Sequence, residues 1–120
     1  SEIEQVLLSI FKNGAEAMTQ YKKDMPTEIA DEITPTFTIT TTKEKQHVII
    51  RICDNGPGMD ESVRKRVFEP FFTTREIGHG TGLGLSVSYM LVTTNHNGSI
   101  SCESVPGKGT CFTIQLPTRA

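Results

Sequence analysis

Long apolar runs are missing from this sequence of 120 residues. No stretch approaches the ~18 apolar residues that a membrane-spanning helix needs, and the charged start, Ser1 to Ile10, does not resemble a signal peptide. We therefore expect no membrane contact by this domain. A positive charge excess is missing too, because the formal net charge is −2, and this argues against a nucleic-acid-binding protein. Repeats and low-complexity segments are absent, and the length suits one domain.

Cysteine is scarce as well. The three cysteines, Cys53, Cys102 and Cys111, are odd in number and have no spacing typical of metal ligands. Free thiols in a reducing compartment are the default interpretation of such a set, and we therefore expect a cytoplasmic domain. No start methionine precedes the first helical segment, so we expect a fragment of a longer protein.

Hydrophobic periodicity predicts a chain of helices and paired strands. Apolar residues recur at helical spacing over residues 3–18 and again over 83–94, and Asp60 can cap a short helix over 60–67. Alternating patterns predict two hairpins, 37–41 with 48–53 and 99–104 with 110–116, while residues 22–35 and 72–82 are expected to be connections. This order indicates an α+β fold, with helices layered on a largely antiparallel sheet.

The first helical segment carries two polar residues of interest, Asn13 and Glu16. Asn13 shares the inward face of the helix with Val6 and Ile10. A buried amide usually has a structural partner, but its oxygen is also a hard ligand suited to Mg²⁺. Glu16 follows three residues later and would either assist a metal-bound water or remain a solvated surface carboxylate.

A glycine-rich turn, Asp54 to Met59, follows an apolar strand directly. Gly56 and Gly58 let the backbone turn sharply and lie close to a flat ligand. A carboxylate only accepts hydrogen bonds, so Asp54 suits the exocyclic amine of adenine and would reject the carbonyl of guanine. A plain Asp-Asn-Gly turn is the structural alternative.

Four alternating glycines occupy residues 78–84, directly before a predicted helix. Backbone N–H groups at a helix N-terminus favour anions, and glycine leaves room for a phosphate. No Gly-Lys-Ser/Thr sequence follows, which excludes a Walker-type loop, and no strand directly precedes the glycines, which argues against a dinucleotide fingerprint. A flexible loop is the alternative. Arg75, just upstream, would either reach a phosphate or remain a solvated surface arginine.

Three aromatic residues, Phe68, Phe71 and Phe72, surround Pro70 just before this loop. Such a cluster suggests an anchor beside a mobile lid. Ordinary core packing is the alternative, and we expect it for at least one of the rings.

In order and spacing, these segments resemble the ATP-binding domain of sensor histidine kinases. Its superfamily also holds gyrase, the heat-shock chaperone ATPases and the mismatch-repair ATPases. Residues 12–17 look like the N box of the family, and residues 54–58 look like its first glycine box. Residues 68–72 look like the F box, residues 80–85 look like the second glycine box, and residues 107–110 match the last strand. The resemblance therefore covers essentially the whole chain. It implies a two-layer α/β sandwich of the Bergerat type, with helices on one face of a mainly antiparallel sheet, and a lid at about residues 73–81.

The resemblance also implies roles for single residues. Asn13 would bind Mg²⁺, Asp54 the adenine amine, and Thr110 adenine through a water molecule. Asn13, Glu16 and Arg75 are the catalytic candidates. The residues expected to contact ATP are Lys12, Asn13, Asp54, Gly56, Gly58, Met59, Phe71, Arg75, Gly80, Thr81, Gly82, Leu83, Gly84, Leu85 and Thr110.

Two positions depart from the family pattern. Ser9 stands where many of these kinases carry a second asparagine, and Glu16 stands where many carry a basic residue. Lys12 and Arg75 are the substitutes that we expect for the missing contacts.

The acceptor histidine of the family is missing too. In the family it lies on a helix and is usually followed by an acidic residue, and none of His47, His79 and His96 fits that context. The resemblance therefore implies an acceptor-histidine helical domain upstream in the same protein. It also implies a response regulator receiver domain as partner, and a parent protein that is a homodimer.

Several activities stay open from the sequence. A histidine kinase module positions the γ-phosphate of ATP for a histidine on another domain. An ATPase needs a general base, which relatives supply as a glutamate at the position of Ser9. A serine/threonine kinase and a nucleotide sensor without catalysis remain as alternatives. The kinase module is the preferred hypothesis, mainly because of the boxes at residues 68–72 and 80–85.

Overall fold

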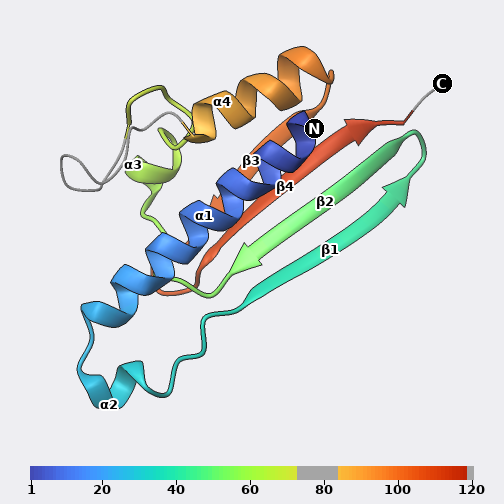
Figure 1. The fold of residues 1–120 in the computed structure, drawn as a ribbon. Coiled ribbons are helices and arrows are strands. Elements are labelled where there is room, and N and C mark those ends of the chain that lie inside the picture. The colour runs from blue at the N-terminus through green and yellow to red at the C-terminus, as the bar shows by residue number, and fades with distance from the viewer. Residues whose placement is uncertain (73–83, 119–120) are drawn as a thin grey trace.

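The computed structural model describes residues 1–72 and 84–118. Its elements are α1 (Glu2–Lys23), α2 (Thr27–Ala30), β1 (Phe37–Glu44), β2 (His47–Asp54), α3 (Glu61–Arg64), α4 (Gly84–Met90), η1 (Leu91–Asn95), β3 (Ser99–Ser104) and β4 (Thr110–Pro117). Helices α1 and α4 lie on one face of an antiparallel sheet with the strand order β1-β2-β4-β3 (Figure 1). The predicted α+β sandwich is therefore confirmed. Within the described ranges, no helix is long and apolar enough to cross a membrane.

Helix α1 is the long element of the helical layer. Its first turn is closed by a capping box, in which the Ser1 side chain accepts the Glu4 N–H and the Glu4 side chain bonds back to Ser1. The helix runs beyond the predicted residue 18 because its last turn is held as well. Lys22 Nζ donates to the Ile33 carbonyl oxygen at 3.0 Å, and basic residues suit the C-terminal end of a helix.

The core lies between α1, α4 and the central strands β2 and β4. In the β2–β4 register, Ile52 is opposite Phe112, and both are buried beneath the helices. Side chains alternate between the two faces of a strand, so Cys53 and Cys111 lie on the face away from the helices. The buried cluster comprises Val6, Ile10, Ile52, Leu91, Val92, Ile100, Cys102, Phe112 and Ile114.

The helices of the second half are less regular than predicted. Helix α3 is a single turn, and the Asp60 carboxylate caps it as expected by accepting the Val63 N–H at 3.0 Å. The predicted helix over 83–94 divides into α4 and the π-helix η1. Gly98 N–H closes its end on the Val92 carbonyl oxygen at 2.8 Å. Both predicted hairpins are present with nearly the predicted bounds.

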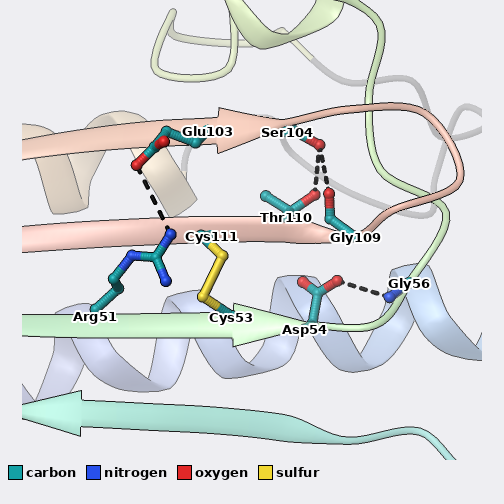
Figure 2. Close-up of a disulfide and its surroundings, with 9 residues drawn as sticks. All are labelled: Arg51, Cys53, Asp54, Gly56, Glu103, Ser104, Gly109, Thr110 and Cys111. Atoms are coloured by element: carbon teal, nitrogen blue, oxygen red, sulfur yellow. Dashed lines mark hydrogen bonds and ion pairs between the residues drawn. A yellow bond between two sulfur atoms is a disulfide. The ribbon is translucent and has the colours of Figure 1, made fainter.

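The prediction of free thiols is wrong for two of the cysteines. Cys53 and Cys111 are register partners in β2 and β4 and form a disulfide across a Cα–Cα distance of 4.0 Å (Figure 2). They are 58 positions apart, so only the strand pairing brings them together. Cys102 is free and buried. The cysteines therefore no longer indicate a reducing compartment.

Shortening Ile10 to alanine should lower the free energy of unfolding by about 2–5 kcal/mol, because a cavity opens in a packed core. Ile10 is 2% exposed, whereas Leu8 on the same helix is 68% exposed. Leu8→Ala is therefore the matched control and should change stability by about 0.5 kcal/mol or less. Urea unfolding of both variants checks this, and equal losses would contradict the packing of α1 on the sheet.

Candidate functional site

Asp54 ends β2 on the sheet face that α1 covers. Its Oδ1 accepts the Gly56 N–H at 2.9 Å (Figure 2). Two glycines leave space for the carboxylate, since a methyl group on Gly14 of α1 would lie 3.1 Å from Oδ2 and one on Gly56 would lie 3.0 Å from Oδ1. The half-buried carboxylate is thus enclosed by backbone on two sides.

The environment of Asp54 acts on its ionisation in two directions. Burial raises the pKa of the Asp54 carboxyl above its ordinary value, while hydrogen bonds from the Gly56 and Thr110 backbone amides act to lower that pKa. A carboxylate offers about four lone-pair sites, so it keeps acceptor capacity beyond these contacts. Asp54 can therefore accept a further N–H from a ligand.

Ser104 joins the glycine-rich turn after β2 to the hairpin of β3 and β4. Its hydroxyl accepts the Met59 N–H at 2.8 Å and donates to the Gly109 carbonyl oxygen at 2.9 Å. The Thr110 hydroxyl oxygen lies 2.9 Å from the Ser104 hydroxyl oxygen (Figure 2). Ser104 was not predicted from the sequence, because its role depends on its register position opposite Thr110. The only local signal for Ser104 was its place at the end of the predicted strand 99–104.

Close backbone approaches fix Asp54 and Thr110 beside each other as register partners. Gly109 has a φ of 83°, and a side chain there would collide with the Asp54 carbonyl oxygen. Gly58 has a φ of 72°, and a side chain there would collide with the Val105 carbonyl oxygen. Glycine is required at both positions for space as well as for conformation.

Asn55 has a structural role. Its Oδ1 accepts the Thr36 N–H and its Nδ2 donates to the Thr34 carbonyl oxygen, both at 2.8 Å. These bonds hold the segment that leads into β1 against the turn. The structural alternative considered for the Asp-Asn-Gly turn therefore applies to its asparagine.

One face of α1 lies beside the start of α4. A methyl group on Gly84, the first residue of α4, would lie 3.8 Å from the Ser9 hydroxyl oxygen. Asn13 and Glu16 follow Ser9 at helical spacing and are half-buried like it. Their oxygens are of the kind that Mg²⁺ accepts. Over residues 1–72 and 84–118, no group of three or more His, Cys, Asp or Glu side chains could hold a metal ion.

The aromatic segment has two half-buried rings, Phe68 and Phe72, and one exposed ring, Phe71. Phe68 packs against Phe112, with ring centroids 6.1 Å apart, so the expectation of core packing for at least one ring is confirmed. Phe71 is 74% exposed at a φ of 65°. The Phe72 ring lies 4.4 Å from the Arg66 guanidinium. Phe71 is therefore the ring that remains open to a ligand or partner.

The other predicted contact residues lie in several places. Lys12 is exposed on α1, and Met59 and Leu85 pack against the core cluster. Thr110 is buried. The predictions that fall outside the described residues are those for Arg75, Gly80, Thr81, Gly82 and Leu83, together with the lid at about residues 73–81.

Comparisons with known proteins agree with one another. The family model described as histidine kinase-, DNA gyrase B-, and HSP90-like ATPase matches residues 1–120. Sporulation kinase E of Bacillus subtilis is 40% identical over 119 residues, which are 99% of this chain and 14% of that protein. Sporulation kinase C of Bacillus subtilis is 33% identical over 120 residues, 100% of this chain and 24% of that protein. This chain thus spans a small part of these relatives.

Solved structures give the same result. The catalytic domain of histidine kinase ThkA, in a nucleotide-free form, has a TM-score of 0.75 at 28% identity, over 98% of this chain and 67% of that chain.

Gly109→Ala should lower the free energy of unfolding by about 3 kcal/mol or more, because the new Cβ would displace the Asp54 backbone. Gly107 is the matched control, since its φ of 79° is similar but nothing lies within 4 Å of a side chain there. Gly107→Ala should lower the free energy of unfolding by only about 1–2 kcal/mol, which is the cost of placing an alanine in the left-handed conformation. Urea unfolding compares the two, and equal losses would contradict the close approach.

Proposed function

Because this chain belongs to the histidine kinase-, DNA gyrase B- and HSP90-like ATPase family, we propose that it binds Mg·ATP and donates the γ-phosphoryl group to a histidine on a separate domain of a two-component sensor kinase. The observation that carries the proposal is the convergence of three distant segments on one face of the sheet. Gly14, beside Asn13, lies against the Asp54 carboxylate, and Thr110 is the register partner of Asp54.

Recognition of adenine is assigned to Asp54. The exocyclic amine of adenine donates to the carboxylate, and Thr110 assists through a bound water molecule. Gly56 and Gly58 supply a wall of backbone without side chains, against which a flat base fits. Guanine presents a carbonyl oxygen where adenine has its amine, so the same carboxylate repels it.

The phosphates are assigned to the side of the site where α1 meets α4. Asn13 would hold Mg²⁺ through its amide oxygen, with Glu16 near the waters of the ion. When bound, Mg²⁺ neutralises charge on the transferring phosphoryl group. Lys12 and Arg75 take the place of the basic contact that the family usually has at the position of Glu16. The half-buried position and the oxygen chemistry of Asn13 fit this role.

Transfer to a histidine is favoured over hydrolysis because of Ser9. Its hydroxyl lies near the start of α4, at the position where hydrolytic relatives carry a glutamate base. A serine hydroxyl is not a base near neutral pH, so water at this site would not be activated. Two alternative activities remain. One is ATP hydrolysis that drives a conformational cycle, and the other is transfer of the phosphoryl group to a serine or threonine.

The proposed partners follow from this reaction. The acceptor histidine lies on a helical domain of the same protein, and the phosphoryl group passes on to the receiver domain of a response regulator. The parent protein is a homodimer, and this domain works in the cytoplasm, where ATP is available. The likeness to the sporulation kinases supports a kinase activity of the parent protein, from which these partners are proposed.

Asp54→Asn should abolish tight ATP binding and leave the fold intact, because the carboxylate that accepts the adenine amine is lost. Calorimetry measures binding, and circular dichroism checks the fold. Asp31→Asn, at an exposed carboxylate after α2, is the matched control and should bind ATP normally. The wild-type protein should bind GTP far more weakly, since an unpaired buried acceptor costs about 1–3 kcal/mol. Equal affinities for ATP and GTP would contradict the assignment.

Asn13→Ala should weaken binding of ATP in Mg²⁺ far more than binding in EDTA, because only the metal contact is removed. Calorimetric titrations of the variant and the wild-type protein in both buffers provide their own control. The same loss of affinity in EDTA as in Mg²⁺ would show that Asn13 is structural.

The isolated domain should bind ATP, hydrolyse it very slowly and carry no label itself. A placed base typically contributes ~10²- to 10⁴-fold to proton abstraction, and Ser9 supplies none. Radiolabelled ATP and the separate helical domain of the parent protein should give an acid-labile phosphohistidine on that domain. Fast phosphate release by the domain alone, abolished by Glu16→Ala, would favour the ATPase. An acid-stable label on the partner would favour the serine/threonine kinase.

A further inference from the structure

A pair of cysteines lies on the sheet face opposite the helices. Cys53 and Cys111 are register partners in β2 and β4 and are joined as a disulfide. Both are half-buried, and the exposed ion pair of Arg51 and Glu103, at 3.9 Å, lies beside them (Figure 2). No helix covers this face in the described part of the chain (Figure 1). A small thiol or disulfide in solution can therefore approach the pair.

The same pair stands one residue away from the candidate adenine site on both strands. Asp54 follows Cys53 directly, and Thr110 precedes Cys111 directly. Asp54 and Thr110 form the next rung of the β2–β4 ladder, and their side chains lie on the other face of the sheet because of strand alternation. A covalent bond at one rung thus constrains the spacing of the strands at the rung that carries the site.

We propose that Cys53 and Cys111 form a reversible thiol–disulfide site, and that its oxidised form holds Asp54 and Thr110 in the geometry that binds the nucleotide. The inference rests on the proposed function, because a domain that uses ATP works in the cytoplasm. Disulfides there are usually transient and often redox-sensing. The pair is therefore a site of reversible modification and not a permanent crosslink.

The oxidant is the disulfide form of a low-molecular-weight thiol. One protein thiolate attacks a sulfur of the small disulfide, which forms a mixed disulfide and releases one small thiolate. The second protein thiolate then attacks the protein sulfur of the mixed disulfide, which forms the Cys53–Cys111 bond and releases the second small thiolate. Two electrons pass from the protein thiols to the small disulfide, and the two protons end on the released small thiols. Excess small thiol reverses both steps.

The third cysteine is unsuited to this chemistry. Cys102 lies in the core on β3, and burial raises the pKa of its thiol to about 12. The thiolate is the reactive species, so Cys102 stays a thiol under the same treatment. Its alanine variant is a control that removes a thiol without touching the pair.

The expected effect of reduction is moderate. The β2–β4 ladder runs over eight register pairs and persists without the disulfide, so the domain stays folded. Only the ordering of the Asp54 and Thr110 rung is relaxed. Ordering one side chain on binding costs an amount that corresponds to roughly two- to tenfold in affinity, and the reduced protein should bind ATP more weakly by this factor.

The test compares the whole 120-residue chain after treatment with oxidised glutathione and after treatment with dithiothreitol. Mass spectrometry with thiol alkylation should find one free thiol in the oxidised sample and three in the reduced one, and calorimetry should give the difference in ATP affinity. Cys102→Ala should keep that difference. Cys53→Ser combined with Cys111→Ser should bind as the reduced wild type does under both treatments.

Three outcomes would overturn the inference. Three free thiols after oxidised glutathione would show that the pair does not form a disulfide. Equal ATP affinities of the oxidised and reduced wild type, with the disulfide present in one of them, would remove its link to the site while the proposed function stands. No ATP binding in either form would overturn the proposed function itself, and the effect assigned to the pair with it.

Discussion

The approach of Gly109 to the backbone of Asp54 is the constraint on which the site depends. A Cβ at Gly109 would meet the Asp54 carbonyl oxygen, so the turn before β4 closes on the end of β2 only because that side chain is missing. This closure makes Thr110 the register partner of Asp54 and brings Ser104 within hydrogen-bonding distance of the Gly109 carbonyl oxygen. One position without a side chain thereby joins two distant parts of the chain into one wall.

Because side chains alternate between the two faces of a strand, the end of β2 places Asp54 on one face of the sheet and Cys53 on the other. Asp54 points toward α1, where burial and backbone amides govern its ionisation, while its neighbour Cys53 lies on the open face beside an exposed ion pair. Asp54 lies beneath the helical layer, whereas no helix of the described residues covers the face that carries Cys53 (Figure 1). Because Cys53–Cys111 and Asp54–Thr110 are neighbouring rungs of the β2–β4 ladder, the proposed effect of the disulfide on the site would pass through the sheet and not through the helical layer.

Local features of the fold could be predicted, and features set by register could not. The Asp60 cap and both hairpins follow from signals within a few residues, because caps and alternation are decided locally. The Cys53–Cys111 bond and the role of Ser104 depend on which strand residues face each other across a long stretch of sequence. The π-helix after α4 also escaped prediction, since periodicity favours a continuous helix there. For the site, the motifs indicated Asp54 and Thr110, but their juxtaposition required the sheet.

The proposed choice between transfer and hydrolysis depends on one turn of α1. Ser9 lies beside the first residue of α4, where a carboxylate would be able to draw a proton from water. Its neutral hydroxyl leaves any water there a weak nucleophile. Glu16 lies one turn beyond Asn13, on the side away from Ser9, and in the proposed site its carboxylate would act on the waters of the metal ion and not on an attacking water. A site that holds ATP without activating water keeps the phosphoryl group for an acceptor that brings its own nucleophile, as the imidazole of a histidine does.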